Sequence, residues 1–193
     1  MILIGPINNY EEYIKSLSKK ARKNFAYVKK HNADLAYQEK EFNKEEVRVF
    51  MRLWEQQLIR GKKVEWAFPV ETVEDWARRG ELKVFGAYKG KELIALHFIR
   101  ERGGYWECHP PMYDKGRFLD RSLAKWMWFK LFEQELGVYN LGGGLDDWRE
   151  MVRERRRFPN TSYKWIYVPE GIKENPEKAP DYYIKDYKLY ERN

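Results

Sequence analysis

The chain has 193 residues, of which 43% are hydrophobic and 17% aromatic, so it is long and apolar enough for one domain with a real core. Its one cysteine excludes an internal disulfide and a zinc site built from thiolates, and its net charge of +7 favours partners that carry phosphate or carboxylate groups. The segment MILIGPINNYEEY turns polar too early for a signal peptide, and no apolar run approaches the roughly 20 residues that cross a bilayer, so a cytoplasmic protein is expected.

A long basic helix is predicted at residues 9–30. Its apolar side chains recur at spacings of three and four, and Asn9 can cap its first turn. From Lys15 to Lys30 the segment holds seven Lys or Arg and no acid. The face opposite the apolar side is therefore strongly basic.

A strand and two further helices follow. The segment DLAYQEKEF, residues 34–42, alternates enough to predict a strand. Asn43 then begins a second helix, and Gly61 lies just past its end. Residues 70–80 predict a third, shorter helix that Gly80 stops.

The middle of the chain changes its hydrophobic period. Residues 82–109 predict three strands, with turns at Lys89-Gly90-Lys91 and at Arg102-Gly103-Gly104. Strands joined by such short turns pair antiparallel. The segment is therefore predicted to form an antiparallel meander.

The last third predicts alternating helices and strands. Residues 118–136 are apolar on most sides, which is typical of a buried helix. A short strand at 138–141, a helix at 146–157 and a last strand at 162–168 follow, before a polar tail at 169–193.

The order of these elements predicts an α+β fold with a mixed central sheet, in which the antiparallel meander is flanked by helices. The expected organisation is one domain at residues 1–168, with basic helices at 9–80 and a core at 81–168. The tail at 169–193 is expected to pack as an arm or a short helix.

Three segments carry a resemblance to a known family: YIKSLSKKARKNFAYVKKH, FGAYKGKELIALHFI, and MYDKGRFLDRSLAKWMWFKLFEQELGVYNLGGG. Their order and spacing resemble acyltransferases of the GNAT superfamily. The branch is the one that holds FemAB-type aminoacyl transferases and stand-alone polysaccharide-biosynthesis acetyltransferases. The resemblance runs from Tyr13 to Val168. It implies a GNAT-like fold and the transfer of an acyl group to an amine or hydroxyl.

The sequence departs from this pattern in three places. The family's Tyr-Lys pair usually follows the glycine-rich strand end, but Asp146-Asp147-Trp148-Arg149 stands there and Tyr163-Lys164 comes later. The small-residue turn before the buried helix is Lys115-Gly116-Arg117. Full FemAB enzymes have two such domains, whereas this chain has room for one.

The resemblance implies that acetyl-CoA or another acyl-CoA donates the acyl group, with its pyrophosphate at the start of the buried helix. Backbone N–H groups and the positive end of a helix attract phosphate. Lys115, Gly116 and Arg117 are therefore the candidate cofactor-binding residues. The alternative reading of these residues is a turn with solvated charges. No metal is expected, because the three histidines are dispersed.

Transfer to an amine needs a base that removes a proton. Glu107 and His109 are two residues apart on a strand, so they share a face and could form a tuned base. His97 is a further candidate, and Tyr113 could protonate a leaving thiolate. Cys108 could carry the acyl group. The alternatives are an ion pair for Glu107, a strand-end position for His109 and a core position for His97.

Candidate acceptor-binding residues surround the glycine-rich strand end. Asp146 could bind an amine or a sugar hydroxyl, or cap a helix. Trp106 and Trp148 could stack on a sugar or base, or pack in the core, and Lys164 could take the role of the family's lysine. The basic run at 153–158 could contact a phosphorylated acceptor or an RNA backbone, or be a solvated face.

Three functions remain open. The first is an N-acyltransferase that uses acyl-CoA and an amine of a sugar, nucleotide-sugar or peptide. The second is a FemAB-like transferase that uses aminoacyl-tRNA, which the basic helix and the arginine run favour. The third is a GNAT-like module without catalysis that binds nucleic acid or a protein.

Overall fold

The computed structural model describes residues 2–17, 19–60, 69–118 and 121–140, together with strand backbones at 164–165, 182–185 and 188–191. The chain divides into two compact units. The first unit comprises Met1–Asn24, Glu101–Cys108 and Phe132–Asn193, and the second comprises Phe25–Arg100 and His109–Leu131.

The second unit is built on the predicted meander. Its strands are β2 (Leu35–Lys40), β3 (Leu82–Lys89), β4 (Glu92–Arg102) and β6 (Met112–Tyr113). They pair antiparallel in the order β2-β3-β4, and β6 pairs with β4. Gly90, with a φ of 60°, takes the left-handed conformation that the β3–β4 turn requires.

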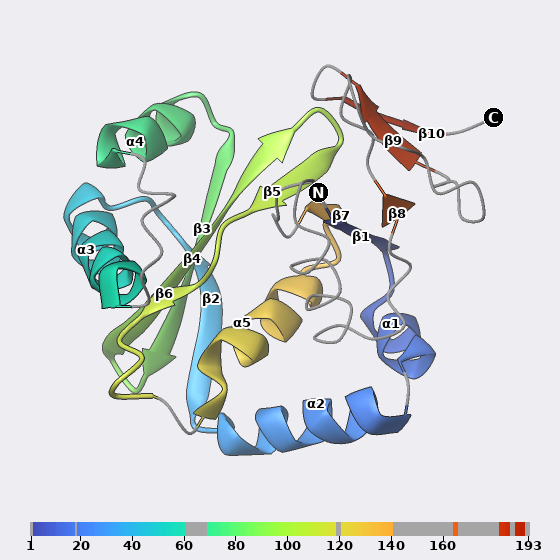
Figure 1. Cartoon of the computed structure of the whole chain (residues 1–193), viewed down its shortest axis with the longest axis horizontal. Helices are drawn as coiled ribbons and strands as arrows, with labels where there is room; N and C mark the ends of the chain where they lie inside the picture. Colours follow the sequence, from blue (N-terminus) through green and yellow to red (C-terminus); the bar gives the residue numbers. More distant parts are fainter. Residues whose placement is uncertain are drawn as a thin grey trace. The chain divides into compact units, whose positions relative to one another are not determined.

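Helices cover both faces of this sheet. Helices α3 (Lys44–Arg60) and α4 (Val70–Arg78) lie on one face, and α5 (Leu123–Phe132) lies on the other (Figure 1). Each face has its own core: Val47, Val73, Trp76 and Phe98 belong to the first, and Leu123, Trp126, Met127 and Ala95 to the second. Burial of these side chains supplies the main stabilisation of the unit.

The helix predicted at 118–136 is wrong at both ends, because α5 spans only Leu123–Phe132. Phe118 is buried in the same core as α5 but lies outside the helix. Ser122, with a φ of 50°, stands immediately before the helix. Phe118 is apolar because it packs in the core from a turn, and its spacing alone did not distinguish it from a residue of the helix.

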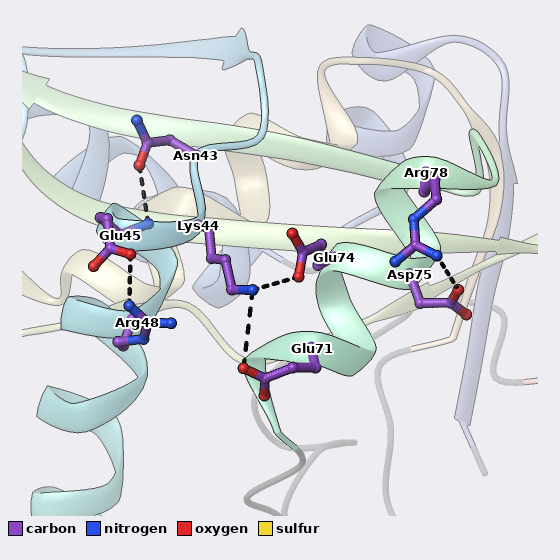
Figure 2. Close-up of polar contacts among 8 residues, drawn as sticks. All are labelled: Asn43, Lys44, Glu45, Arg48, Glu71, Glu74, Asp75 and Arg78. Carbon is purple, nitrogen blue, oxygen red and sulfur yellow. Dashed lines mark hydrogen bonds and ion pairs between the residues drawn. The ribbon is translucent and has the colours of Figure 1, made fainter.

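Polar contacts fix the start of α3 and join it to α4 (Figure 2). Asn43 Oδ1 accepts hydrogen bonds from the backbone N–H groups of Glu45 and Glu46, at 3.0 and 3.1 Å, which confirms the predicted cap. Lys44 Nζ lies 2.5 Å from Glu74 on α4 and 4.0 Å from Glu71. These ion pairs cross between the two helices on one face of the sheet.

The first unit holds a mixed sheet in the order β5-β7-β1-β8. Its strands are β1 (Ile2–Ile7), β5 (Tyr105–Cys108), β7 (Gly137–Asn140) and β8 (Lys164–Trp165). The pair β5–β7 is parallel, whereas β1 pairs antiparallel with both β7 and β8. The predicted α+β class with a mixed sheet is therefore confirmed.

The predicted single helix at 9–30 is wrong, because the structure has α1 (Tyr10–Ser16) and α2 (Lys19–His31). Leu17 ends α1 in an extended conformation, with a ψ of 149°, and is 2% exposed. Arg22 donates hydrogen bonds to the carbonyls of Lys15 and Leu17, at 2.8 and 2.7 Å. The predicted cap is confirmed, since Asn9 Oδ1 accepts from the N–H of Glu12 at 3.1 Å.

The described part of the tail is a pair of antiparallel strands, β9 (Tyr182–Lys185) and β10 (Lys188–Glu191). The tail was expected to pack as an arm or as a short helix, and this described part is not helical. The helix predicted at 146–157 lies outside the described residues. The division into one domain at 1–168 and an arm at 169–193 stays a prediction.

Replacing Gly86 on β3 by alanine is expected to destabilise the protein by about 1 kcal/mol, because the half-buried side chains of Tyr88 and Leu93 would have to move away from the added Cβ. That Cβ would lie 2.6 Å from Tyr88 and 2.9 Å from Leu93. The measurement is the urea midpoint of unfolding. Gly116→Ala is the control, since its Cβ meets only Asp114 Oδ1 at 3.3 Å. Equal midpoints for the two variants would contradict the prediction.

Candidate functional site

The strand that carries the candidate site is interrupted after Cys108. In the first unit β5 pairs with β7 through Trp106 and Glu107. In the second unit β6 pairs with β4 two prolines later. Between them the N–H of His109 donates to the carbonyl of Phe98 at 3.1 Å, and the prolines have no N–H to offer. The strand therefore breaks here, and His109 has the strand-end position that was the alternative for it.

His97 on β4 is fully buried, with 0% exposure. Its Nδ1 lies 3.1 Å from the hydroxyl of Tyr37, and its ring packs edge-on against Trp128 with centroids 4.7 Å apart. Burial lowers the pKa of His97 to about 3; the charge of His109 adds to this, and the backbone of His109 opposes both as the smallest effect. His97 is therefore neutral at physiological pH.

His109 lies in a stack of aromatic rings in the second unit. Its ring centroid is 5.4 Å from that of Trp76, with planes 23° apart, and 4.9 Å from that of Phe98. The guanidinium of Arg100 lies 4.7 Å from the Trp76 ring, and Glu81 pairs with this guanidinium at 2.7 Å. His109 is half-buried, unlike His97. Its ring orientation is thus set by packing.

Glu107 has a different partner from His109. Its Oε2 accepts from Arg102 Nε at 3.1 Å within the first unit, which matches the ion-pair alternative. The contacts described for the two residues do not join them as the expected Glu–His pair. A catalytic role for either residue stays a prediction.

Two other candidates on this strand are buried. Tyr113 on β6 is 8% exposed and belongs to the core under α5. Cys108 is 3% exposed, and its Sγ lies 3.3 Å from the carbonyl of Trp106. Burial raises the pKa of the Cys108 thiol well above its ordinary value, and the charge of Glu107 adds to this rise. The sulfur is therefore a thiol at neutral pH, which is a poor nucleophile.

The candidate cofactor turn has its donors occupied. Asp114 Oδ1 accepts from the N–H groups of Gly116 at 2.9 Å and Arg117 at 3.3 Å. The guanidinium of Arg117 pairs with both oxygens of Glu92, and this pairing lowers the pKa of Glu92. Lys115 is exposed. A phosphate could use these amides only if the carboxylate of Asp114 turned away.

Trp106, a candidate for acceptor binding, makes a hydrogen bond within the first unit. Its indole N–H donates to the carbonyl of Leu136 at 3.1 Å, and the N–H of Leu136 donates to the hydroxyl of Tyr139 at 2.8 Å. Lys164 lies on β8, where its backbone pairs with Leu3. Asp146, Trp148 and the run at 153–158 lie outside the described residues.

Trp106→Phe is expected to destabilise the protein by about 1 kcal/mol, because the phenyl ring keeps most of the packing but loses the hydrogen bond to Leu136. Urea unfolding measures the loss. Tyr139→Phe removes the adjacent hydrogen bond, from the N–H of Leu136 to the hydroxyl of Tyr139. If the two hydrogen bonds support each other, the double variant should lose less stability than the sum of the two single losses. Additive losses would show that the two bonds are independent.

The residues around His109 were not predicted as part of the site. Trp76 lies on α4, far from His109 in the sequence, and no local spacing relates them. Arg100 could have been identified from the sequence, since it directly follows the apolar run of β4. A charged residue at the end of such a run usually has a partner.

No cluster of three or more metal-ligating side chains occurs within the described ranges. Among the helices that the structure describes, none is long and apolar enough to cross a bilayer.

Solved structures of other proteins align with this chain. FemX aligns with a TM-score of 0.61 at 10% identity, over 83% of this chain and 58% of FemX. A conserved protein of unknown function from Bacteroides thetaiotaomicron aligns with a TM-score of 0.51 at 8% identity, over 82% of this chain and 54% of that protein. An aminoglycoside acetyltransferase from an uncultured soil metagenomic sample, in complex with trehalose, aligns with a TM-score of 0.44 at 9% identity, over 74% of this chain and 99% of that one.

The alignments with FemX and with the Bacteroides protein show that this chain shares their fold, as the resemblance to FemAB-type proteins implied. The chain spans little more than half the length of FemX and of the Bacteroides protein. No protein-family model matches the sequence, and no curated protein matches it either.

Proposed function

We propose that this chain is a transferase that moves an acyl or aminoacyl group to an amine. The observation that carries the proposal is the alignment with FemX over 83% of the chain. The three sequence segments that resemble the GNAT superfamily support it independently, because they come from both the basic helices and the sheet.

The reaction needs one proton acceptor and one leaving group. The amine nitrogen attacks the acyl carbonyl, the bond from that carbonyl to sulfur or oxygen breaks, and the leaving group takes up a proton. Of the candidate histidines, His109 is the better choice of proton acceptor, because burial lowers the pKa of His97 to about 3 and makes His97 a weak base. The stack with Trp76 would hold the imidazole in one orientation.

His109→Gln is expected to lower kcat by about a hundredfold or more, because glutamine keeps a hydrogen-bonding group but accepts no proton at neutral pH. The assay measures acyl transfer to an amine acceptor under saturating donor. Glu107→Gln is the matched comparison, since Glu107 already pairs with Arg102. A larger loss with Glu107→Gln would move the role of base to Glu107.

The first choice of donor is acetyl-CoA or another short acyl-CoA, with an amine of a sugar, nucleotide-sugar or peptide as acceptor. Lys115, Gly116 and Arg117 would bind its phosphates. Because Asp114 now accepts from two of the turn's amides, Asp114→Ala is expected to tighten acetyl-CoA binding about tenfold. Arg117→Gln should weaken it by a similar factor.

The second candidate is a transferase that takes its aminoacyl group from a charged tRNA. The turn at Lys115–Arg117 favours this candidate, because Asp114 already accepts from its N–H groups. A donor that carries its aminoacyl group as an ester of tRNA does not need these groups to bind the pyrophosphate of CoA. A thermal shift with acetyl-CoA separates the two candidates, since a ligand bound only by the folded state raises the melting temperature. No shift, together with transfer from charged tRNA, would select the second, and transfer from neither donor would refute both.

A further inference from the structure

Helix α2 holds most of the net charge of the protein. Its 13 residues contain six Lys or Arg and no acid, while the whole chain has a net charge of +7. The rest of the chain is therefore nearly neutral, at +1. The side chains of Lys20, Lys23 and Lys30 are exposed. The net positive charge of this helix thus nearly equals that of the whole chain.

The lysines of α2 contrast with many other described cations, which form ion pairs. Elsewhere in the described ranges, ion pairs hold Lys40, Lys44, Lys83, Arg100, Arg117 and Arg121. No ion pair involving an α2 lysine occurs among the described residues. Arg22 of the same helix donates to carbonyl groups. The positive charge of α2 is thus left for a partner.

This arrangement works against the stability of the helix. Lys19 and Lys20 stand in the first turn, where the helix dipole favours acids. Lys19 and Lys23 are four residues apart, and like charges at that spacing repel. Neither cost is offset by a contact in the described structure, which indicates that the charge serves a binding role.

An aromatic pair lies on the same stripe as the lysines. Residues 20, 23, 27, 30 and 31 follow one another at helical spacing, so the helix itself places them on one face. Tyr27 is 51% exposed, and its ring lies on that of His31 with centroids 3.8 Å apart and planes 31° apart. The carbonyl of Tyr27 also lies 2.9 Å from His31 Nδ1, which fixes the histidine beneath the ring.

We propose that this stripe binds single-stranded nucleic acid, with Lys20, Lys23 and Lys30 on phosphates and Tyr27 under an unpaired base. Cationic side chains interleaved with an exposed aromatic are what single strands recognise. A membrane surface fits less well, because a helix that lies on lipid must insert an apolar face. The apolar side of α2 already packs inside the protein: Val28 is 1% exposed, and the ring centroids of Phe25 and Phe129 are 4.7 Å apart. The inference does not depend on which acyl donor the transferase uses.

The test is fluorescence anisotropy of the whole chain with a labelled single-stranded RNA of about 12 nucleotides. Three phosphate contacts predict a slope of log K against log salt of about −2, because single strands give about −0.7 per contact. Lys20→Gln/Lys23→Gln should reduce the slope to about −0.7. Tyr27→Ser should weaken binding about tenfold by removing the stack.

The matched control is Arg48→Gln/Lys83→Gln, which removes the same number of charges from residues paired with Glu45 and Glu39. It should leave the affinity and the salt slope unchanged. Equal losses in the two double variants would overturn the proposal, as would an unchanged affinity for Tyr27→Ser. Binding of phosphatidylserine vesicles that depends on Lys20 and Lys23 while the RNA does not bind would assign the stripe to a membrane instead.

Acyl-transfer assays on the same variants keep this test separate from the proposed function. RNA binding without transfer from any donor would refute the transferase and leave the stripe intact. Acyl transfer without RNA binding would refute the nucleic-acid proposal for the stripe and leave the proposed transferase function intact.

Discussion

Glu81→Ala is expected to destabilise the protein by about 2–3 kcal/mol, because it leaves a buried guanidinium without its counter-charge. Arg100 is 8% exposed, and its Nε and Nη2 lie 2.8 and 2.7 Å from Glu81 Oε2. Breaking a fully buried pair costs more, about 3–5 kcal/mol. The side chain of Glu81 is 28% exposed, so water screens part of the interaction and the expected loss is smaller.

Arg100→Met should cost only about 1 kcal/mol, since it removes the buried charge together with its desolvation penalty. Glu81 then keeps Arg79, whose Nε lies 3.2 Å away. The double variant should be nearly as stable as Arg100→Met alone, because it loses only the exposed pair between Glu81 and Arg79. Urea unfolding of the four proteins forms a double-mutant cycle. Additive losses would show that the pair contributes nothing as a pair.

The parts of the fold that the sequence predicted are those built from local patterns. Strands β3, β4 and β5 alternate or run apolar between glycine turns, and the turn at Gly90 has the left-handed conformation that its glycine implied. The caps at Asn9 and Asn43 are equally local, since an Asn side chain reaches only the next turn of its own chain.

What was missed depends on contacts between distant segments. Strand β1 contains Gly5 and Pro6, which weaken any strand pattern, and it pairs with β7, more than 120 residues later in the sequence. Leu17 keeps the helical spacing of its neighbours but is extended and buried. Spacing alone cannot tell a helical leucine from one that packs at a helix end.

The candidate site shows the same division. The break at His109 was predictable, since two prolines follow it. Its stacking partner Trp76 was not, because only the folded sheet brings α4 to the strand end. Asp114 could have been found, because an Asp followed by Lys-Gly-Arg commonly accepts from the amides two and three residues ahead. That one residue decides whether the turn is open to phosphate.

His97 is expected to make the stability of the protein fall as the pH falls below about 6.5. Its pKa is about 3 in the folded protein, against an ordinary value of 6.5. Below 6.5 the unfolded chain therefore binds a proton that the folded chain refuses, so protonation favours unfolding. Above 6.5 both states are neutral and His97 adds no pH dependence. The loss is about 1.4 kcal/mol per pH unit, or roughly 2.7 kcal/mol at pH 4.5.

The measurement is the free energy of unfolding at pH 7 and pH 4.5 for the native chain and for His97→Gln. Glutamine can still bond the hydroxyl of Tyr37 but does not titrate. Carboxylates titrate in both proteins, so their contribution cancels in the difference. The native chain should lose about 2–3 kcal/mol more than His97→Gln over this interval. Leu96→Val, at a neighbouring buried position, should lower stability at both pH values and keep the native pH dependence. Parallel profiles for the native chain and His97→Gln would mean that the imidazole takes up a proton inside the fold. In that case His97, not His109, would become the stronger candidate for the catalytic base, since a buried histidine that can titrate needs access to water or substrate.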